Sequence, residues 1–424
     1  MDMTRSTVSG KGKQQLLIVL SVLVYAAVYV GRYSYSANIG SVMTAYGVSR
    51  ADAGLVSTFF FFSYGAAQLV HAVLCKYYPK KYVIPGALLI MAGINFALFC
   101  APPFAAIKYL WMANGIVQAL IWPTLVQAWG ELLDADMMPR ATFLISLSLP
   151  IGTVVAYGSS ALFNLFSFWR GAFLLGLIIP AALGVIWLLS YDAIEAGGRQ
   201  VAAPTVAEQT ESAAPARTGR RRMGAVLVEL TVVCACIQAI VCFVRDGLST
   251  WAPVLLSEQF GLADSNSIVL TLILPLFGIF GSALAMRTNR WIRDFRALCG
   301  FFCLLTSVCL LGLRISLDLS QVVPALILMG VTSCLVHGVV TVVVNIMPLS
   351  LRDRVDPGFL SGLLNACGYV GSTVSAYGLG SIADGLGWSA VLRVLLYAAI
   401  GATVLAGIAV LVDLWQKRKR ADRA

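Results

Sequence analysis

Charged residues are scarce in this chain. Asp, Glu, Lys and Arg make up 12% of the 424 residues, whereas soluble domains use roughly 25%. Hydrophobic residues make up 59% and the mean hydropathy is +0.84, which excludes a water-soluble protein. Apolar runs of about 20 residues or more recur along the whole length, and each is long enough to cross a bilayer as a helix. The composition predicts an integral membrane protein.

The sequence also lacks the motifs of an enzyme. It contains no glycine-rich phosphate loop, no nucleophile elbow and no cluster of metal ligands, so nothing indicates ATP hydrolysis or another catalytic activity. The ten cysteines lie almost entirely within apolar segments, where they act as packing residues. We expect no disulfide, no metal site and no cofactor.

The net charge of +10 would suggest a nucleic-acid partner if the protein were soluble. Here the Lys and Arg residues fall mainly in the short connections between apolar segments, where such residues set the orientation of membrane helices. We therefore expect the chain to lie in the lipid bilayer and to bind no nucleic acid.

Twelve membrane helices are predicted from the apolar runs, with ends placed to within about four residues. They cover 15–42, 51–75, 82–101, 104–130, 138–166 and 169–191 in the first half, and 225–257, 265–287, 295–315, 320–349, 356–384 and 388–415 in the second. The segment between the halves is rich in Ala, Thr, Glu and Pro and predicts a solvated linker. The predicted domains are a six-helix bundle at 1–191, the linker at 192–224 and a second six-helix bundle at 225–424.

The distribution of basic residues tests this map. With both termini on one side, 23 of the 30 Lys and Arg residues fall on that face and five on the other. The positive-inside rule then places the termini and the linker in the cytoplasm, as in a multi-pass protein of the inner (cytoplasmic) membrane. Two basic residues are left over, Arg32 and Arg245, because both lie inside predicted helices.

Internal repetition supports the division into two halves. IGTVVAYGSSALFNLFSFWR, from Ile151, is similar to VGSTVSAYGLGSIADGLGW, from Val370, and both contain Ala-Tyr-Gly followed by a Trp. An aromatic-Gly-aliphatic sequence also follows each buried arginine at a similar distance, around Gly47 and Gly261. The chain is thus predicted to be a duplication, and in duplicated transporters the substrate binds between the repeats near the middle of the membrane.

The two left-over arginines are the main candidates for a binding site. A charge at such depth costs about 2.5 kcal/mol or more, so each arginine needs a partner or a function. Arginine suits phosphate because its guanidinium stays charged and offers planar, bidentate donors. The alternative is that each pairs with a carboxylate or a carbonyl for structure. Asp246 adjoins Arg245, but neighbouring helical residues point about 100° apart, so we expect these two side chains not to meet.

Other candidate substrate-binding residues are aromatic, amide or imidazole side chains of the predicted helices. They are Tyr29, Tyr33, Tyr35, Asn38, Gln68, Gln118, Trp122, Trp251 and His337. For each, ordinary helix packing is the alternative. His337 could titrate, bind an anion or carry a proton, or it could be a neutral ring bonded to a neighbouring helix. Asp246 is the only carboxylate deep in a predicted helix, which argues against a proton relay of several acids.

Some of these residues fall in motifs. The sequence RxGLxxWxP begins at Arg245, Trp122 and Pro123 form a Trp-Pro pair, and NACGYVGSTVSAYGLGSIADGLGW occupies the eleventh helix. In these motifs the sequence resembles the organophosphate:phosphate antiporters of the major facilitator superfamily, which include the glycerol-3-phosphate and hexose-phosphate transporters. The resemblance covers all twelve helices but is dense only in the first, fourth, seventh and eleventh.

The resemblance implies that Arg32 and Arg245 bind the phosphoryl group while an organic phosphate is exchanged for inorganic phosphate. The chain also differs from the family around this site. The differing positions are Tyr33 and Gln68 in place of lysines, Leu149 in place of a histidine and Pro275 in place of a glutamate.

We thus predict an all-α membrane protein of two pseudo-symmetric six-helix bundles that works as a secondary transporter and as a monomer. Its expected partners are a small anionic substrate, foremost a phosphorylated metabolite, and phosphate as the counter-anion. Two alternatives stay open. The same fold could carry a carboxylate such as a uronate, or the protein could be a transporter-like membrane sensor that binds the anion and signals to a partner.

Overall fold

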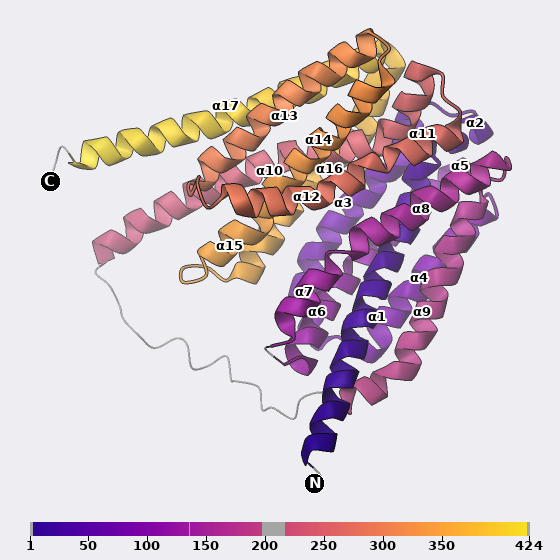
Figure 1. The fold of residues 1–424 in the computed structure, drawn as a ribbon, viewed down its shortest axis with the longest axis horizontal. Coiled ribbons are helices and arrows are strands. Elements are labelled where there is room, and N and C mark those ends of the chain that lie inside the picture. The colour runs from indigo at the N-terminus through magenta and orange to yellow at the C-terminus, as the bar shows by residue number, and fades with distance from the viewer. Residues whose placement is uncertain (1–2, 135, 197–216, 422–424) are drawn as a thin grey trace.

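The computed structural model describes residues 3–134, 136–196 and 217–421, and all regular secondary structure in these ranges is helical (Figure 1). Eleven of the described helical segments are long and apolar enough to cross a membrane. The remaining predicted span is α16 (Pro357–Leu386), a helix of 30 residues that is rich in Gly and Ser. The all-α membrane fold predicted from the sequence is confirmed.

The described part of the first half contains ten helical elements. They are α1 (Met3–Ala37), α2 (Ile39–Tyr46), α3 (Arg50–Leu74), a 3₁₀ turn (Cys75–Tyr77), α4 (Lys80–Phe99), α5 (Phe104–Ala119), α6 (Ile121–Leu132), α7 (Met138–Ile145), α8 (Ser148–Leu165) and α9 (Gly171–Glu195). The second half consists of α10 (Arg217–Phe260), α11 (Asp264–Thr271), α12 (Ile273–Thr288), α13 (Phe295–Asp318), α14 (Val322–Thr341), a π-helical turn (Val342–Ile346), α15 (Met347–Ser350), α16 and α17 (Trp388–Ala421). Both α9 and α10 extend into the predicted linker, and residues 197–216 lie outside the described residues.

Prolines explain why several predicted spans are broken in two. A proline ring clashes with the carbonyl group four residues earlier and cannot donate a backbone hydrogen bond. Pro123 follows the break between α5 and α6, Pro150 the break between α7 and α8, and Pro275 the break between α11 and α12. Pro348 follows the π-helical turn after α14 in the same way. The fourth, fifth, eighth and tenth predicted helices are therefore discontinuous.

The glycines that marked the sequence repeat have matching conformations. Gly47 ends α2 with φ of 63°, and Gly261 follows α10 with φ of 64°. The residue after each glycine closes the helix end with a backbone hydrogen bond. The N–H of Val48 donates to the carbonyl of Met43, and the N–H of Leu262 donates to the carbonyl of Ser257. This left-handed helix end favours glycine. The two halves therefore share a local structure as well as a sequence pattern.

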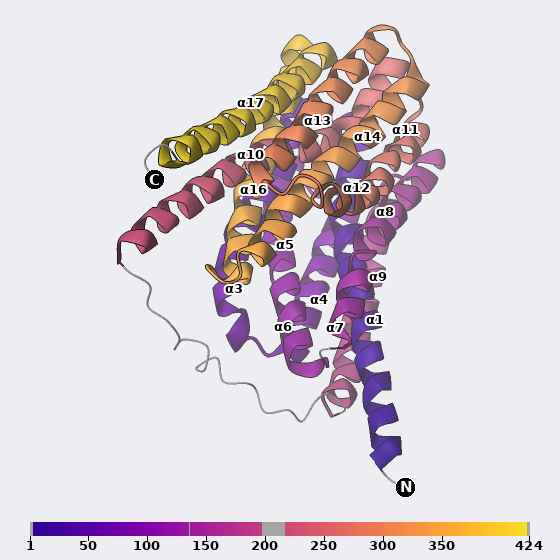
Figure 2. The same ribbon diagram turned by 60° about the vertical axis from the view of Figure 1, so that its left-hand side comes forward.

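The two halves meet at one end and diverge toward the other. Figures 1 and 2 both show α8 and α11 near the end where the halves meet, and Figure 1 also shows α2 there, while the halves separate toward the chain termini. The antiparallel pair α3 and α16 joins them. Thr58 of α3 donates to the carbonyl of Thr373, and the N–H of Tyr377 donates back to Thr58. One hydrophobic core continues through this contact, and a second belongs to the first half alone.

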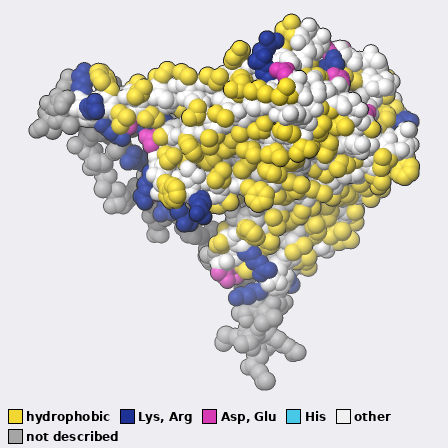
Figure 3. Space-filling model, turned by 45° about the horizontal axis from the view of Figure 1, so that its top comes forward, with side chains coloured by type: hydrophobic (Ala, Val, Ile, Leu, Met, Phe, Trp, Pro, Cys, Tyr) yellow, Lys and Arg dark blue, Asp and Glu magenta, His cyan; other side chains and the backbone are white. Residues whose placement is uncertain are grey.

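The outer surface suits a bilayer. Figure 3 shows a broad hydrophobic face with Lys and Arg side chains gathered near its margins. Large apolar side chains are exposed on this type of surface, for example Leu189, which is 78% exposed, and Val374, which is 57% exposed. Exposure of this extent would be costly in water, and in lipid it costs nothing.

Candidate functional site

A cavity of about 860 Å³ lies between the two halves. Its walls come from α1, α3, α6 and α8 of the first half and from α10, α12, α14 and α16 of the second. The mouth is lined by Val73 near the end of α3 and by Asp356 and Phe359 at the start of α16. This is the end at which the halves diverge (Figure 1). A cavity of this size can take a metabolite with up to a few rings.

The helix breaks border this cavity. Trp122 and Pro123 line it beside the break before α6, Leu149 beside the break before α8, and Pro275 beside the break before α12. Asn345 lines it from the π-helical turn. Backbone that leaves regular helix geometry is tolerated at membrane depth only where it is buried in protein or faces a water-filled cavity. The prolines thus place irregular backbone where a transporter binds its substrate.

Arg32 faces the cavity from α1 within a group of aromatic rings. Its Cζ atom lies 4.9 to 5.9 Å from the centroids of the rings, which belong to Tyr33, Phe60, Phe61, Tyr64 and Tyr369. We call these five residues the aromatic cage. The negative faces of such rings stabilise a guanidinium. Within the described part of the chain, no hydrogen bond or ion pair joins Arg32 to an acceptor.

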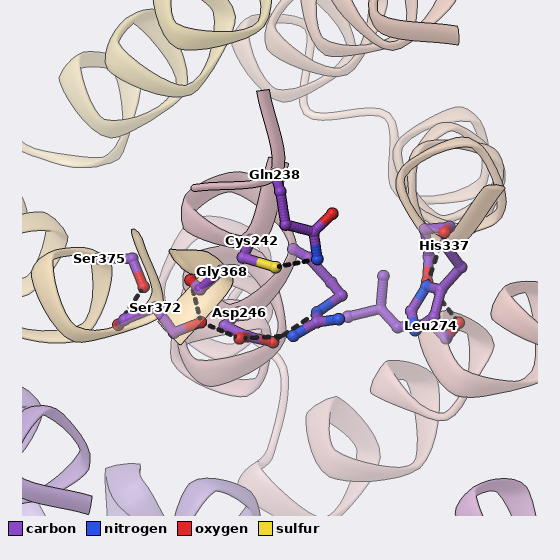
Figure 4. Close-up of polar contacts among 10 residues, drawn as sticks. Gln238, Cys242, Asp246, Leu274, His337, Gly368, Ser372 and Ser375 are labelled. Atoms are coloured by element: carbon purple, nitrogen blue, oxygen red, sulfur yellow. Dashed lines mark hydrogen bonds and ion pairs between the residues drawn. The ribbon is translucent and has the colours of Figure 1, made fainter. Parts of the chain in front are cut away.

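Arg245 faces the same cavity from α10, but it is paired. Its Nε atom donates to Oδ1 of Asp246, and Nη2 donates to Oδ2, each over 2.8 Å. The Ser372 hydroxyl of α16 also donates to Oδ2 of Asp246 (Figure 4). The expectation that the adjacent Arg245 and Asp246 point apart is therefore wrong. The arginine side chain is long enough to reach the carboxylate of its neighbour.

Tyrosines form much of the remaining wall. Tyr25, Tyr29 and Tyr33 follow one another along one face of α1, because they are spaced by four residues. Tyr157 joins them from α8. Its hydroxyl donates to the carbonyl of Ser249 over 3.3 Å, a carbonyl that Pro253 leaves without its helical donor. Tyr157 thereby links the first half to the second.

Two further predicted site residues line the cavity with polar groups. Gln68 of α3 accepts a hydrogen bond from Asn365 of α16 over 3.0 Å. His337 of α14 forms a contact of 2.8 Å between its Nδ1 atom and the carbonyl of Ser333 in the same helix. His337 lies across the group from Asp246 and Ser372 in Figure 4. The Nδ1 bond of His337 therefore lies within α14 rather than to a neighbouring helix.

The structure brings most of the predicted site residues together but places four elsewhere. Tyr35 is buried and donates to the carbonyl of Ala53. Asn38 stands at the break between α1 and α2 and donates to Ser160. The remaining two are Gln118, which donates to Asn114 inside the first half, and Trp251, which donates to the carbonyl of Ala376. None of the four lines the cavity, and their bonds serve helix packing.

Sequence reasoning missed several cavity residues. One of them is Tyr25, and its spacing of four residues from Tyr29 could have indicated it, since residues four apart share a helix face. Tyr64, Tyr157 and Tyr369 reach the cavity from three other helices, and only the packing of those helices reveals them. No group of three or more His, Cys, Asp or Glu in the described ranges is placed to hold a metal ion.

Ion pairs join the halves at the end opposite the cavity mouth. Arg50, the first residue of α3, binds Glu258 of α10 over 2.6 Å and Asp384 of α16 over 2.9 Å. Trp388 donates to the same Glu258 carboxylate over 2.7 Å. We call these four residues the Arg50 cluster. Because they come from both halves, the cluster holds the interface shut at this end while the cavity is open at the other.

Comparisons with known proteins agree with this architecture. The profile of the Major Facilitator Superfamily matches residues 21–376. Protein spinster homolog 1 of Rattus norvegicus is 24% identical in an alignment of 317 residues, and the alignment covers 69% of this chain and 57% of the rat protein. Membrane sensor protein UhpC of Escherichia coli (strain K12) is 21% identical in an alignment of 294 residues, which covers 63% of each chain. This chain therefore spans just over half the length of the rat relative.

Solved structures show the same fold. A bacterial homologue of the human lysosomal transporter Spinster, in an inward-facing and occupied conformation, superposes with a TM-score of 0.68 at 15% identity, over 96% of this chain and 97% of that one. The D-xylose-proton symporter superposes with a TM-score of 0.67 at 13% identity, over 94% and 96%. With the family match over residues 21–376 and two helical halves around a central cavity, the chain belongs to the Major Facilitator Superfamily.

Proposed function

We propose that this protein is a membrane transporter that carries a small organic anion by alternating access. The anionic group binds at Arg32 and the organic part rests against the tyrosines of the cavity. The halves rock about their interface, so that the cavity faces first one side of the membrane and then the other. We further propose that the chain works as a monomer in the cytoplasmic membrane, with the cavity mouth of this structure toward the cytoplasm.

One observation carries the proposal. Arg32 lines a cavity at membrane depth, and the described structure provides it with no acceptor. A permanent charge at that depth is costly, and rings alone contribute only about 0.5–2 kcal/mol each. An anion that enters the cavity and bonds to the guanidinium would supply the missing partner. A structural arginine, by contrast, would already have one, as Arg50 does.

The resemblance of the sequence to organophosphate:phosphate antiporters supports a phosphorylated metabolite as substrate and phosphate as counter-anion. The second candidate is a carboxylate such as a uronate. The ion pair between Arg245 and Asp246 favours it, because a phosphate dianion would find only one unpaired arginine where the resemblance implies two.

Counterflow in proteoliposomes tests the function. Vesicles loaded with unlabelled phosphate are given labelled phosphate outside, and a second set is loaded with glucuronate and given labelled glucuronate. We expect exchange in at least one set and its loss in Arg32→Gln. Arg314→Gln is the matched control, because Arg314 lies on α13 beside Asp318 and not at the cavity. Exchange by Arg32→Gln at the wild-type rate would overturn the proposal.

The same vesicles distinguish a transporter from a sensor. If a labelled anion binds the purified protein but no flux occurs in either set, the protein acts as a sensor, the role that the name of its relative from Escherichia coli carries. Flux that depends on Arg32 supports transport.

A further inference from the structure

Asp246 stands at an unusual place for a carboxylate. It lies in the middle of α10, it is only 6% exposed, and it borders both the large cavity and a smaller space that Arg32 also lines. A buried carboxylate of this kind is costly unless it is paired and hydrogen-bonded. Neither the motif resemblance nor the proposed function gives Asp246 a role.

The bonds of Asp246 fix its position from two helices. Two parallel N–H donors of Arg245 occupy one oxygen each, and Ser372 of α16 donates to the second oxygen. A fork of this kind is among the strongest hydrogen-bond arrangements available to a carboxylate. The same bonds use Nε and Nη2 of the Arg245 guanidinium, so this edge cannot also bind a substrate in a bidentate way.

The pair changes the charge that the cavity offers to a substrate. The deep charged groups that line it are Arg32, Arg245 and Asp246. Two positive charges and one negative charge leave a net charge of one. The other carboxylate of the lining, Asp356, is exposed at the mouth. His337 bonds to a backbone carbonyl through Nδ1.

An anion must leave water to enter this site, so its charge has to be matched there. A single negative charge is balanced by Arg32. A second negative charge would lie near the carboxylate of Asp246 and would have no unpaired cation, and both effects oppose binding where water is partly excluded.

We propose that Asp246 is a specificity-determining residue that limits the substrate to one negative charge. It does so by neutralising Arg245, while Ser372 holds the carboxylate in position. The substrate class is then an organic monoanion, such as a monocarboxylate or a phosphodiester, and phosphate monoesters in their doubly charged form are disfavoured. The inference rests on the proposed function, because it requires that an anion binds at Arg32.

Matched probe pairs test this inference on the purified protein in detergent. Glucuronate is compared with glucose 6-phosphate, and phenylacetate with phenyl phosphate, at pH 7.5, where the monoesters carry close to two charges because their second pKa is about 6. The measured quantity is the ratio of the two dissociation constants within each pair. In the wild type we expect the carboxylate to bind more tightly by about tenfold or more.

Two variants of the pair change the net charge in a controlled way. Asp246→Asn leaves Arg245 unpaired, so the ratio should move toward the phosphate by about tenfold or more. The double variant Arg245→Gln/Asp246→Asn restores a net charge of one, and the preference for the carboxylate should return. Asp318→Asn, which changes an aspartate on α13 away from the cavity, is the control and should leave the ratio unchanged. The melting temperature of each variant shows whether it is folded.

The outcomes separate this inference from the proposed function. Equal or tighter binding of the phosphates by the wild type, or an unchanged ratio in folded Asp246→Asn, overturns the charge limit. Arg32→Gln should lose measurable affinity for all four probes. If it keeps them, the proposed function is wrong whatever the ratio does. If no probe binds the wild type, both proposals are overturned. If Asp246→Asn does not fold, the double variant decides: a preference for phosphate there also overturns the charge limit.

Discussion

Each half of the molecule brings one arginine to the central cavity, yet the two arginines have different surroundings. Arg32 lies in a cage of aromatic rings and has no bonded carboxylate in the described structure. Arg245 holds Asp246 through two bonds of 2.8 Å. The two halves therefore share the charge at the cavity but not its environment. One half supplies an unpaired cation for an anion, and the other supplies a neutral pair that shapes the charge of the site.

Arg50 extends the comparison. It is paired with two carboxylates across the interface, at the end opposite the cavity mouth. Arginines that have protein partners thus hold parts of this structure together, whereas Arg32, which lines the cavity without a bonded carboxylate among the described residues, is the candidate for binding. The comparison predicts that substitutions of the paired arginines change stability or conformation first, and that substitution of Arg32 changes binding first.

The largest expected effect on stability comes from breaking the buried pair. Arg245→Gln leaves Asp246 without a cation, and removing one member of such a pair costs about 3–5 kcal/mol. The double variant Arg245→Gln/Asp246→Asn removes both charges, so most of that loss should be recovered. Thermal unfolding in detergent measures both. A double variant as unstable as the single one would mean that the two residues do not stabilise each other.

The aromatic cage should have a smaller effect, which concerns binding. Tyr64→Leu removes a ring whose centroid is 5.5 Å from Cζ of Arg32. A cation–π contact contributes about 0.5–2 kcal/mol, so the apparent affinity for the transported anion should fall by about two- to thirtyfold, whereas Tyr64→Phe should retain most of it. Tyr397→Leu, which removes an exposed ring from α17, is the control. Equal affinities in Tyr64→Leu and Tyr64→Phe would show that the ring does not support Arg32.

The smallest expected effect belongs to the Arg50 cluster, because its side chains are partly exposed. An ion pair of this kind contributes about 0.5 kcal/mol and Arg50 forms two, so Arg50→Gln should shift the balance between the open and closed conformations of this end by about fivefold. Distances between spin labels on the loops that follow α2 and α10 report this balance. Arg314→Gln breaks an ion pair within one half and should leave the distances unchanged. A shift of equal size in both variants would contradict a role specific to the interface.

The fold followed from the sequence because apolar length and the charge of the connections are local properties. The helix breaks did not, although Pro123, Pro150 and Pro275 are visible in the sequence, because apolar runs alone do not show where a helix bends. The Arg32 cage could not be predicted either. Its rings come from α1, α3 and α16, and only the packing of these helices brings them together.

The bond between Arg245 and Asp246 shows a different limit of sequence reasoning. The angle of about 100° between neighbours on a helix describes where side chains begin, and it says little about where a long, flexible side chain ends. The adjacent carboxylate was visible, but the contact depended on the reach of arginine. The likeness of the two arginines in the sequence therefore predicted a symmetric site, and the structure shows an asymmetric one.

The central claim is that Arg32, and not the pair of Arg245 with Asp246, binds the anion. Equilibrium binding of glucuronate and of glucose 6-phosphate to three proteins tests it most directly: the wild type, Arg32→Gln and the double variant Arg245→Gln/Asp246→Asn. We expect Arg32→Gln to lose the affinity of the better probe by about a hundredfold or more, because a charged partner of the anion is removed. The double variant should keep that affinity to within about tenfold. Retained affinity in Arg32→Gln together with its loss in the double variant would contradict the account.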